Sequence, residues 1–110
     1  MKRFLGSRRA HPGVKWILQG LPLDMTVTRR HGTAQAPTVI REESHGLETY
    51  SFLLDKDLSD VHFFDVGNLN LPGDDLGRSL GIIEAVSSRF FTMGRRIVSF
   101  GGEHLVTLPV

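Results

Sequence analysis

Short apolar segments separated by a long amphipathic stripe are the feature of this sequence that most constrains its fold. Residues 14–18 (VKWIL), 61–66 (VHFFDV) and 97–100 (IVSF) are each short, apolar and rich in β-branched or aromatic residues, so we predict three buried strands. Between the second and the third, apolar residues recur every three or four positions, which predicts an amphipathic helix. The members of this stripe are Leu76, Leu80, Ile83, Val86, Phe90 and Met93. Strands that alternate with helices indicate an α/β fold with a parallel sheet and right-handed crossovers.

Breaker residues set the limits of a second, shorter helix. The first strand candidate ends at the motif GLP (residues 20–22), and an irregular segment follows over residues 22–37. A loop of this length in a compact domain is unusual, and such loops are often functional. Pro37 suits the first turn of a helix, where its missing N–H has no hydrogen bond to lose. We therefore predict a helix over residues 38–45 that ends at Gly46.

Polar and aromatic residues complete the predicted framework. Asp74 can cap the long helix by accepting hydrogen bonds from the free N–H groups of its first turn, and Gly94 ends that helix. The tail over residues 105–110 can begin another helix.

Five phenylalanines are expected in the core rather than on a base-stacking surface, because no basic groove adjoins them. They are Phe63, Phe64, Phe90, Phe91 and Phe100.

Composition places the chain among globular proteins and leaves little reason to expect a nucleic-acid or membrane partner. Its 110 residues suit one domain over residues 1–110, with 40% hydrophobic and 23% charged residues. The net charge is only +1, from 13 Lys and Arg against 12 Asp and Glu. The one basic concentration is Lys2, Arg3, Arg8 and Arg9. It is either a phosphate-binding arm or a solvated flexible terminus, and we favour the terminus.

Cysteine is absent, which excludes disulfides, thiolate metal sites and a cysteine nucleophile. This composition fits a reducing cytoplasm, and we expect a cytoplasmic protein. No apolar run is long enough to cross a bilayer, and the first residues lack the apolar core of a secretory signal.

Three motifs resemble the arginase and agmatinase family of ureohydrolases. GLPLDMT (residues 20–26) is similar to the family's Gly-x-Pro-x-Asp-x-Thr after the first strand. IREESHGLETYS (residues 40–51), followed by LLDKDLSDVHFFDVGN (residues 53–68), resembles the agmatinase helix and strand end that come next. GGEH (residues 101–104) matches the family's Gly-Gly-[Asp/Glu]-His. Each motif alone is weak, but all three occur in family order and spacing over residues 4–110, with the agmatinase branch as the best match.

The resemblance implies a fold, a reaction and one metal ligand. The family fold is a three-layer α/β/α domain around a parallel sheet, with two Mn²⁺ ions at the carboxyl ends of strands. About three of its strands are expected here. The family reaction releases urea from a small guanidino compound; in the agmatinase branch agmatine gives urea and putrescine, a step of polyamine metabolism. The metals bridge a water and lower its pKa. His104 matches a manganese ligand, and a homo- or hetero-oligomer is expected.

Most of the other family ligands have no counterpart in this sequence. The family supplies them from an Asp-Ala-His-x-Asp motif and a later Asp-x-Asp motif, both after Gly-Gly-Glu-His, and no Asp-x-His-x-Asp occurs here. Because Mn²⁺ needs several oxygen ligands besides imidazole, we expect this chain to be inactive alone. The alternatives are a non-catalytic module or a split-enzyme subunit that binds a ureohydrolase partner. The strand ending at Phe100 would be interior in the family fold, so one of its sides is expected to lack a neighbour.

The remaining polar residues have plain structural interpretations beside functional ones. Glu103 is expected to be a structural anchor or a helix N-terminal charge rather than a catalyst. His31 and His45 could form a second site, but exposed loop and helix positions are favoured. Asp65 and Asn68 either face a cleft or cap the turn after their strand, and we leave both possibilities open.

Three positions depart from the family pattern. His31 stands where the family usually has Pro, Ala36 where it has Gly, and Asn68 where it has Asp. The change at Ala36 matters if that backbone needs a positive φ, which a Cβ disfavours.

Overall fold

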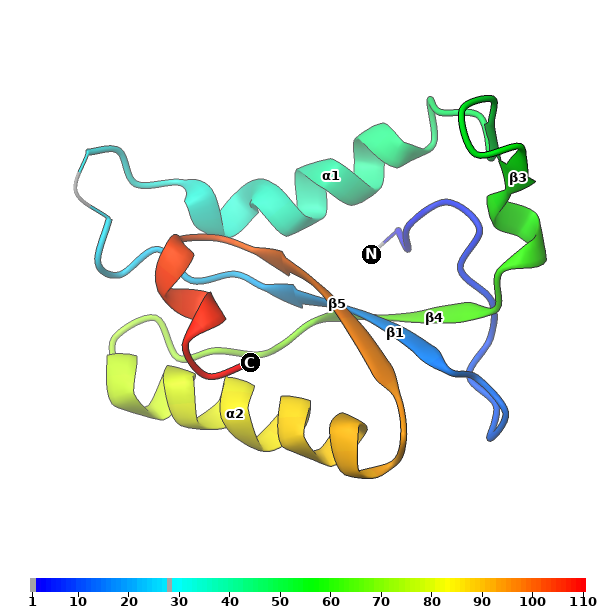
Figure 1. The fold of residues 1–110 in the computed structure, drawn as a ribbon. Helices are drawn as coiled ribbons and strands as arrows, with labels where there is room; N and C mark the ends of the chain where they lie inside the picture. Colours follow the sequence, from blue (N-terminus) through cyan, green and yellow to red (C-terminus); the bar gives the residue numbers. More distant parts are fainter. Residues whose placement is uncertain (1, 28) are drawn as a thin grey trace.

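The computed structural model describes residues 2–27 and 29–110 as a three-stranded parallel sheet with one helix on each face (Figure 1). The sheet order is β4-β1-β5, so the first strand lies in the middle. Its strands are β1 (Trp16–Leu21), β4 (Phe63–Asn68) and β5 (Arg96–Gly101). The helices are α1 (Ala36–Ser44) and α2 (Leu76–Thr92). This arrangement confirms the predicted α/β class, the three parallel strands and the long amphipathic helix.

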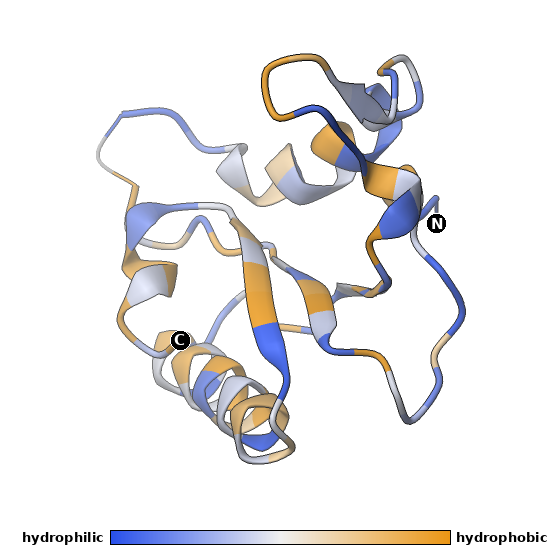
Figure 2. Ribbon diagram, turned by 45° about the vertical axis from the view of Figure 1, so that its right-hand side comes forward, coloured by the Kyte–Doolittle hydropathy of each residue, from blue (hydrophilic) through white to orange (hydrophobic). Residues whose placement is uncertain are grey.

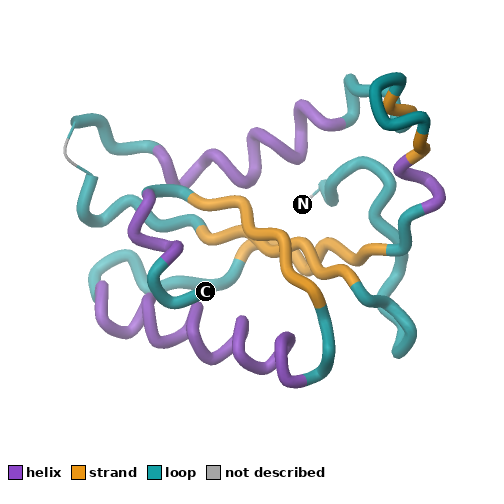
Figure 3. The backbone as a smooth tube through the Cα atoms, in the orientation of Figure 1, coloured by secondary structure: helices purple, strands orange, loops and turns teal. Residues whose placement is uncertain are grey.

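Short elements complete the chain, as the tube in Figure 3 shows. A hairpin is made of β2 (Tyr50–Ser51) and β3 (Lys56–Asp57), which pair antiparallel. Single 3-10 turns occur at Thr33–Gln35, Leu58–Asp60 and His104–Thr107. The sequence did not predict the hairpin, because strands of two residues are too short to show an alternating pattern.

Several predicted boundaries were wrong by a few residues. The first strand continues to Leu21, because residues 19–21 pair through the backbone with residues 99–101 of β5. Gln19 is fully buried in this extension, and its amide NH₂ donates to Ser87 and Ser99. Asp75, not Asp74, caps α2 by accepting from the backbone N–H of Arg78 at 3.0 Å.

The C-terminal tail and the backbone at Ala36 bear on two further expectations. The tail begins with a 3-10 turn rather than an α-helix. Ala36 has a φ of −54°, so the departure from glycine there strains nothing.

The core lies between the sheet and α2. Its buried cluster is formed by Leu21, Leu23, Ile83 and Val106. The hydropathy colouring of Figure 2 shows apolar residues along the strands, while apolar and polar residues alternate along α2. Phe63 is buried as predicted, but Phe91 is 77% exposed, because the side of α2 that meets the sheet carries Ser79, Ile83 and Ser87 instead.

In the basic N-terminal segment Lys2, Arg3, Arg8 and Arg9 are exposed, as the favoured solvated terminus requires, but the backbone is hydrogen-bonded to the protein rather than free. The backbone N–H of Arg8 donates to the carbonyl of Phe63 at 2.9 Å, and that of Asp65 donates to Ser7 Oγ at 2.9 Å. The N–H of Leu5 donates to Ser44 Oγ at 3.0 Å. Residues 4–8 therefore run along the outer side of β4.

No helix within the described residues is long and apolar enough to cross a membrane.

Candidate functional site

The loops after β1 and β5 meet at the carboxyl ends of the strands, where open α/β sheets normally carry their ligand sites. The backbone N–H of Gly102 donates to the carbonyl of Leu21 at 2.9 Å. The N–H of Glu103 donates to the carbonyl of Leu23 at 2.8 Å. These two bonds continue the β1–β5 pairing past the sheet and join two of the three family-like motifs.

Close approach of the two loops explains the second glycine of Gly-Gly-Glu-His. A Cβ on Gly102 would lie 2.1 Å from the carbonyl oxygen of Leu23 and 2.9 Å from its nitrogen. Since both atoms belong to the backbone, no side-chain rotation could relieve the overlap. Glycine at position 102 therefore allows the contact that places the following residues.

Glu103 anchors the loop after β1, which confirms its predicted structural part. The side chain is buried and accepts from the backbone N–H of Thr26 at 2.8 Å and from the Thr26 hydroxyl. The carboxylate thus satisfies polar groups of a segment 77 residues earlier in the chain. It is occupied by these bonds and is not directed at a substrate.

His104 is an exposed residue that begins the last 3-10 turn. It lines a cavity of about 370 Å³ together with Ser99, Gly101, Gly102 and Glu103. Within residues 2–27 and 29–110, no group of three or more His, Asp or Glu side chains is placed to hold a metal ion. The donor set near His104 therefore does not fit a two-metal centre, because one imidazole leaves most coordination positions of Mn²⁺ unfilled.

The other histidines that could have formed a second site are apart and exposed. The Nδ1 atom of His31 lies 3.2 Å from the carbonyl oxygen of Asp24. The Nε2 atom of His45 lies 2.8 Å from the carbonyl oxygen of Arg3. The carboxylate of Asp24 accepts from the N–H of Gly32, whose φ of 121° suits glycine. These side chains organise loops, as the plainer interpretation predicted.

A buried ion pair between α1 and β4 was missed by the sequence analysis. Arg41 on α1 and Asp65 on β4 are fully buried, and Arg41 Nε donates to Asp65 Oδ2 at 2.8 Å. Arg41 also donates through Nη2 to Asp65 Oδ1 at 3.0 Å and through Nη1 to Asn68. Asp65 therefore faces an arginine rather than a cleft. A carboxylate inside the apolar run VHFFDV was the available signal, since a buried charge requires a partner.

The carboxylate of Asp65 also accepts hydrogen bonds from backbone N–H groups. It accepts from the backbone N–H of Phe4 at 2.8 Å and from that of Gly67 at 2.9 Å, so it also caps its own turn. Burial raises the pKa of Asp65, but the guanidinium of Arg41 and the N–H groups of Phe4 and Gly67 outweigh burial and hold this pKa below its ordinary value of 3.8.

Stability should consequently fall in acid. A carboxyl with a lowered pKa in the folded state stabilises the fold above its unfolded pKa, and this contribution is lost as the pH falls through the folded pKa. We expect the difference in free energy of unfolding between the native chain and Asp65→Asn to shrink progressively below pH 3.8. Urea unfolding at pH 7 and at a series of acid pH values measures it. A difference that is constant with pH would contradict the assignment.

Comparisons with known proteins agree with this geometry. The model of the Arginase family matches residues 14–110. The chain is 44% identical to an agmatinase of Bacillus subtilis over 109 residues, which are 99% of this chain and 38% of that protein. It is 39% identical to an agmatinase of Bacillus anthracis, with the same coverage.

Solved structures show the same fold. The agmatine ureohydrolase of Thermoplasma volcanium superposes with a TM-score of 0.91 at 27% identity, over 99% of this chain and 37% of that chain. A formiminoglutamase of Trypanosoma cruzi superposes at 0.79 with 20% identity, over 97% and 38%, which shows the fold alone. The chain thus spans about two fifths of the length of the relatives it matches. By the family match over residues 14–110, the chain belongs to the arginase family.

Proposed function

We propose that this chain supplies the first strands and one metal-ligand position, His104, of an agmatinase-like ureohydrolase that converts agmatine to urea and putrescine. The observation that carries the proposal is the junction between GLPLDMT and GGEH at the carboxyl ends of β1 and β5. The identity of 44% to a protein named agmatinase supports the substrate class. The proposed setting is the cytoplasm, in polyamine metabolism, with Mn²⁺ as the metal.

The 110-residue chain does not perform this reaction by itself in our proposal. His104 is a single candidate ligand, and the residues that the structure describes contain no cluster of three potential ligands. Hydrolysis of a guanidinium group therefore needs residues from beyond these 110, either on the same polypeptide or on a partner. Either source could pack beside β5, where the described residues place no further strand.

A fusion protein tests the proposal. In this fusion, residues 1–110 would replace the matching part of the Bacillus subtilis agmatinase. That part is 38% of the length of the agmatinase. We expect the Mn²⁺-loaded fusion to release urea from agmatine and the 110-residue chain alone to release none. His104→Ala in the fusion should lower kcat/KM by at least about tenfold to a hundredfold, because changing an outer-shell partner of a metal ligand already costs that much and His104 is proposed as a ligand itself.

The matched control is His62→Ala. His62 is also exposed but precedes β4, at the opposite end of the sheet from His104. Its removal should leave the rate unchanged. A folded fusion without activity, or urea release by the chain alone, would overturn the proposal.

A further inference from the structure

The loop after β1 lies at the same end of the sheet as His104. In Figure 1 this loop and the 3-10 turn His104–Thr107 both lie beyond the carboxyl ends of β1 and β5. Two contacts fix the loop there. The carbonyl of Leu23 accepts from the N–H of Glu103 at 2.8 Å, and the Glu103 carboxylate accepts from the N–H of Thr26 at 2.8 Å. Side chains of this loop therefore lie next to the position that we propose for the guanidinium group.

His31 is the residue at which this loop departs from the family, which usually has proline there. Its Nδ1 atom lies 3.2 Å from the carbonyl oxygen of Asp24. A carbonyl oxygen can only accept, so Nδ1 carries a proton and donates it to Asp24. In the neutral ring, Nε2 then has a lone pair and no proton, so Nε2 accepts hydrogen bonds. Proline offers no acceptor on its side chain.

The imidazole of His31 is anchored through Nδ1 and exposed to solvent. Within residues 2–27 and 29–110, its only hydrogen bond is the one to Asp24. The carboxylate of Asp24 accepts in turn from the N–H of Gly32 at 2.9 Å, so two hydrogen bonds hold the two ends of the loop together. Gly32 allows this turn with its φ of 121°. An acceptor that is already anchored loses less conformational entropy on binding than one on a free segment.

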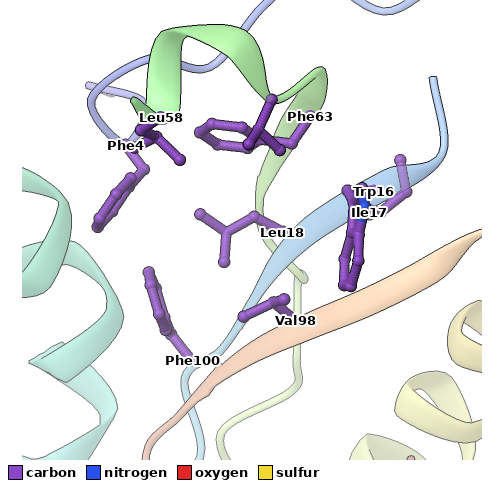
Figure 4. A pocket seen from close by; sticks show the side chains of 9 residues that line it. Phe4, Trp16, Ile17, Leu18, Leu58, Phe63, Val98 and Phe100 are labelled. Atoms are coloured by element: carbon purple, nitrogen blue, oxygen red, sulfur yellow. The ribbon is translucent and has the colours of Figure 1, made fainter. Parts of the chain in front are cut away.

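The proposed substrate needs an acceptor of this kind. Agmatine carries an ammonium group at the end opposite its guanidinium, and an ammonium ion has three N–H donors that are costly to remove from water without partners. Figure 4 shows the hollow of about 260 Å³ on the α1 side of the sheet, whose nine lining residues are apolar and offer no side-chain acceptor. The loop after β1 offers Nε2 of His31 and the carboxylate of Asp24.

We propose that Nε2 of His31 accepts a hydrogen bond from the ammonium group of an aminoalkylguanidine substrate, which makes His31 a specificity-determining residue. The inference rests on the proposed function and names the substrate group that this loop recognises. Arg29 and Arg30 of the same loop are exposed cations and would attract a substrate that ends in a carboxylate instead. The unprotonated Nε2 decides between the two groups, because it accepts from an ammonium but has no proton to donate to a carboxylate.

Three guanidino compounds test the inference in the Mn²⁺-loaded fusion described above. They differ at the end opposite the guanidinium: agmatine has an ammonium, butylguanidine a methyl group and 4-guanidinobutyrate a carboxylate. Urea release gives kcat and KM, and titration calorimetry gives Kd for each compound. The informative variant is His31→Asn. Asparagine Nδ2 can replace Nδ1 as the donor to Asp24, but asparagine has no acceptor where Nε2 lies.

We expect His31→Asn to raise KM and Kd for agmatine by about tenfold, the lower end of what a hydrogen bond to a charged group contributes, because the loop is exposed. The kcat for agmatine should change by less than about twofold, since the bond is equally present in the ground state and the transition state. For butylguanidine and 4-guanidinobutyrate, KM and Kd should also stay within about twofold.

Two further variants separate recognition from loop structure. His62→Asn is the matched control: His62 is exposed and lies at the opposite end of the sheet, so all three compounds should bind as before. His31→Ala removes the anchor as well as the acceptor. A normal KM for agmatine in His31→Asn beside a raised KM in His31→Ala would show that the ring only anchors the loop, and it would overturn the inference. An equal rise for all three compounds in His31→Asn would overturn it as well.

Failure of the proposed function is visible separately. A fusion that binds agmatine but releases no urea contradicts agmatinase activity, while the Kd values of the native and His31→Asn fusions still decide the role of His31. A fusion that releases urea with the same KM for agmatine in both forms contradicts the role of His31 and leaves the activity. A folded fusion that binds none of the three compounds overturns both.

Discussion

Replacing Arg41 by methionine is expected to lower the free energy of unfolding of the chain by about 3–5 kcal/mol. Methionine keeps an unbranched apolar chain like the first part of the arginine side chain, but it lacks the guanidinium and donates no hydrogen bond. Asp65 would then keep a carboxylate at 0% exposure without its cation, and Asn68 would lose a donor. A buried charge without a partner is the costly case, whereas a completed buried pair contributes little beyond a well-packed apolar pair.

Urea unfolding at pH 7 measures this loss, and two further variants define its origin. Arg78→Met is the matched control: Arg78 is exposed on α2, so its replacement should change stability by no more than about 0.5 kcal/mol. In Arg41→Met combined with Asp65→Asn, the buried charge is absent, while the single Asn oxygen still accepts from one of the two N–H groups, that of Phe4 or that of Gly67. This double variant should lose less than the sum of the single losses. Strict additivity would contradict the ion pair as the cause.

The fold was predictable where one local pattern decides the outcome. Short apolar segments and an apolar stripe at helical spacing can each be recognised within a few consecutive residues. The structure confirms the three parallel strands and α2 that these patterns predict. The patterns failed where the deciding partner is distant in sequence. Gln19 can lie buried within β1 because Ser87 and Ser99, 68 and 80 residues later, accept its amide hydrogens.

The candidate site was predictable only as motifs. The sequence contains GLPLDMT and GGEH, but not the two backbone bonds that bring them together. Glu103 could be identified as an anchor from its position, whereas its partner Thr26 could not. Arg41 was missed because an arginine on a short amphipathic helix is normally solvated. It is buried here because it pairs with Asp65 of β4, which lies 24 residues later in the sequence. Phe91 was misplaced because it was grouped with the other phenylalanines as core, although it lies outside the apolar stripe of α2.

Replacing Gly102 by alanine is expected to lower the free energy of unfolding by about 3 kcal/mol. The new methyl group would overlap the carbonyl oxygen of Leu23, 2.1 Å away, so the loops after β1 and β5 would have to separate. Separation lengthens the bonds from Gly102 to Leu21 and from Glu103 to Leu23, and it draws the buried carboxylate of Glu103 away from Thr26. Several hydrogen bonds weaken together, which is why one methyl group has a large effect.

Gly81→Ala provides the matched control for this prediction. Gly81 lies within α2, and a Cβ there would meet no atom within 4 Å. The same chemical change should therefore raise the free energy of unfolding by about 0.5–1 kcal/mol, since alanine is the better helix former. Urea unfolding measures both variants, and hydrogen exchange of the Gly102 and Glu103 amides locates the damage. Equal effects of the two substitutions, or unchanged exchange at these amides in Gly102→Ala, would show that close backbone approach is not what holds the junction between the two loops.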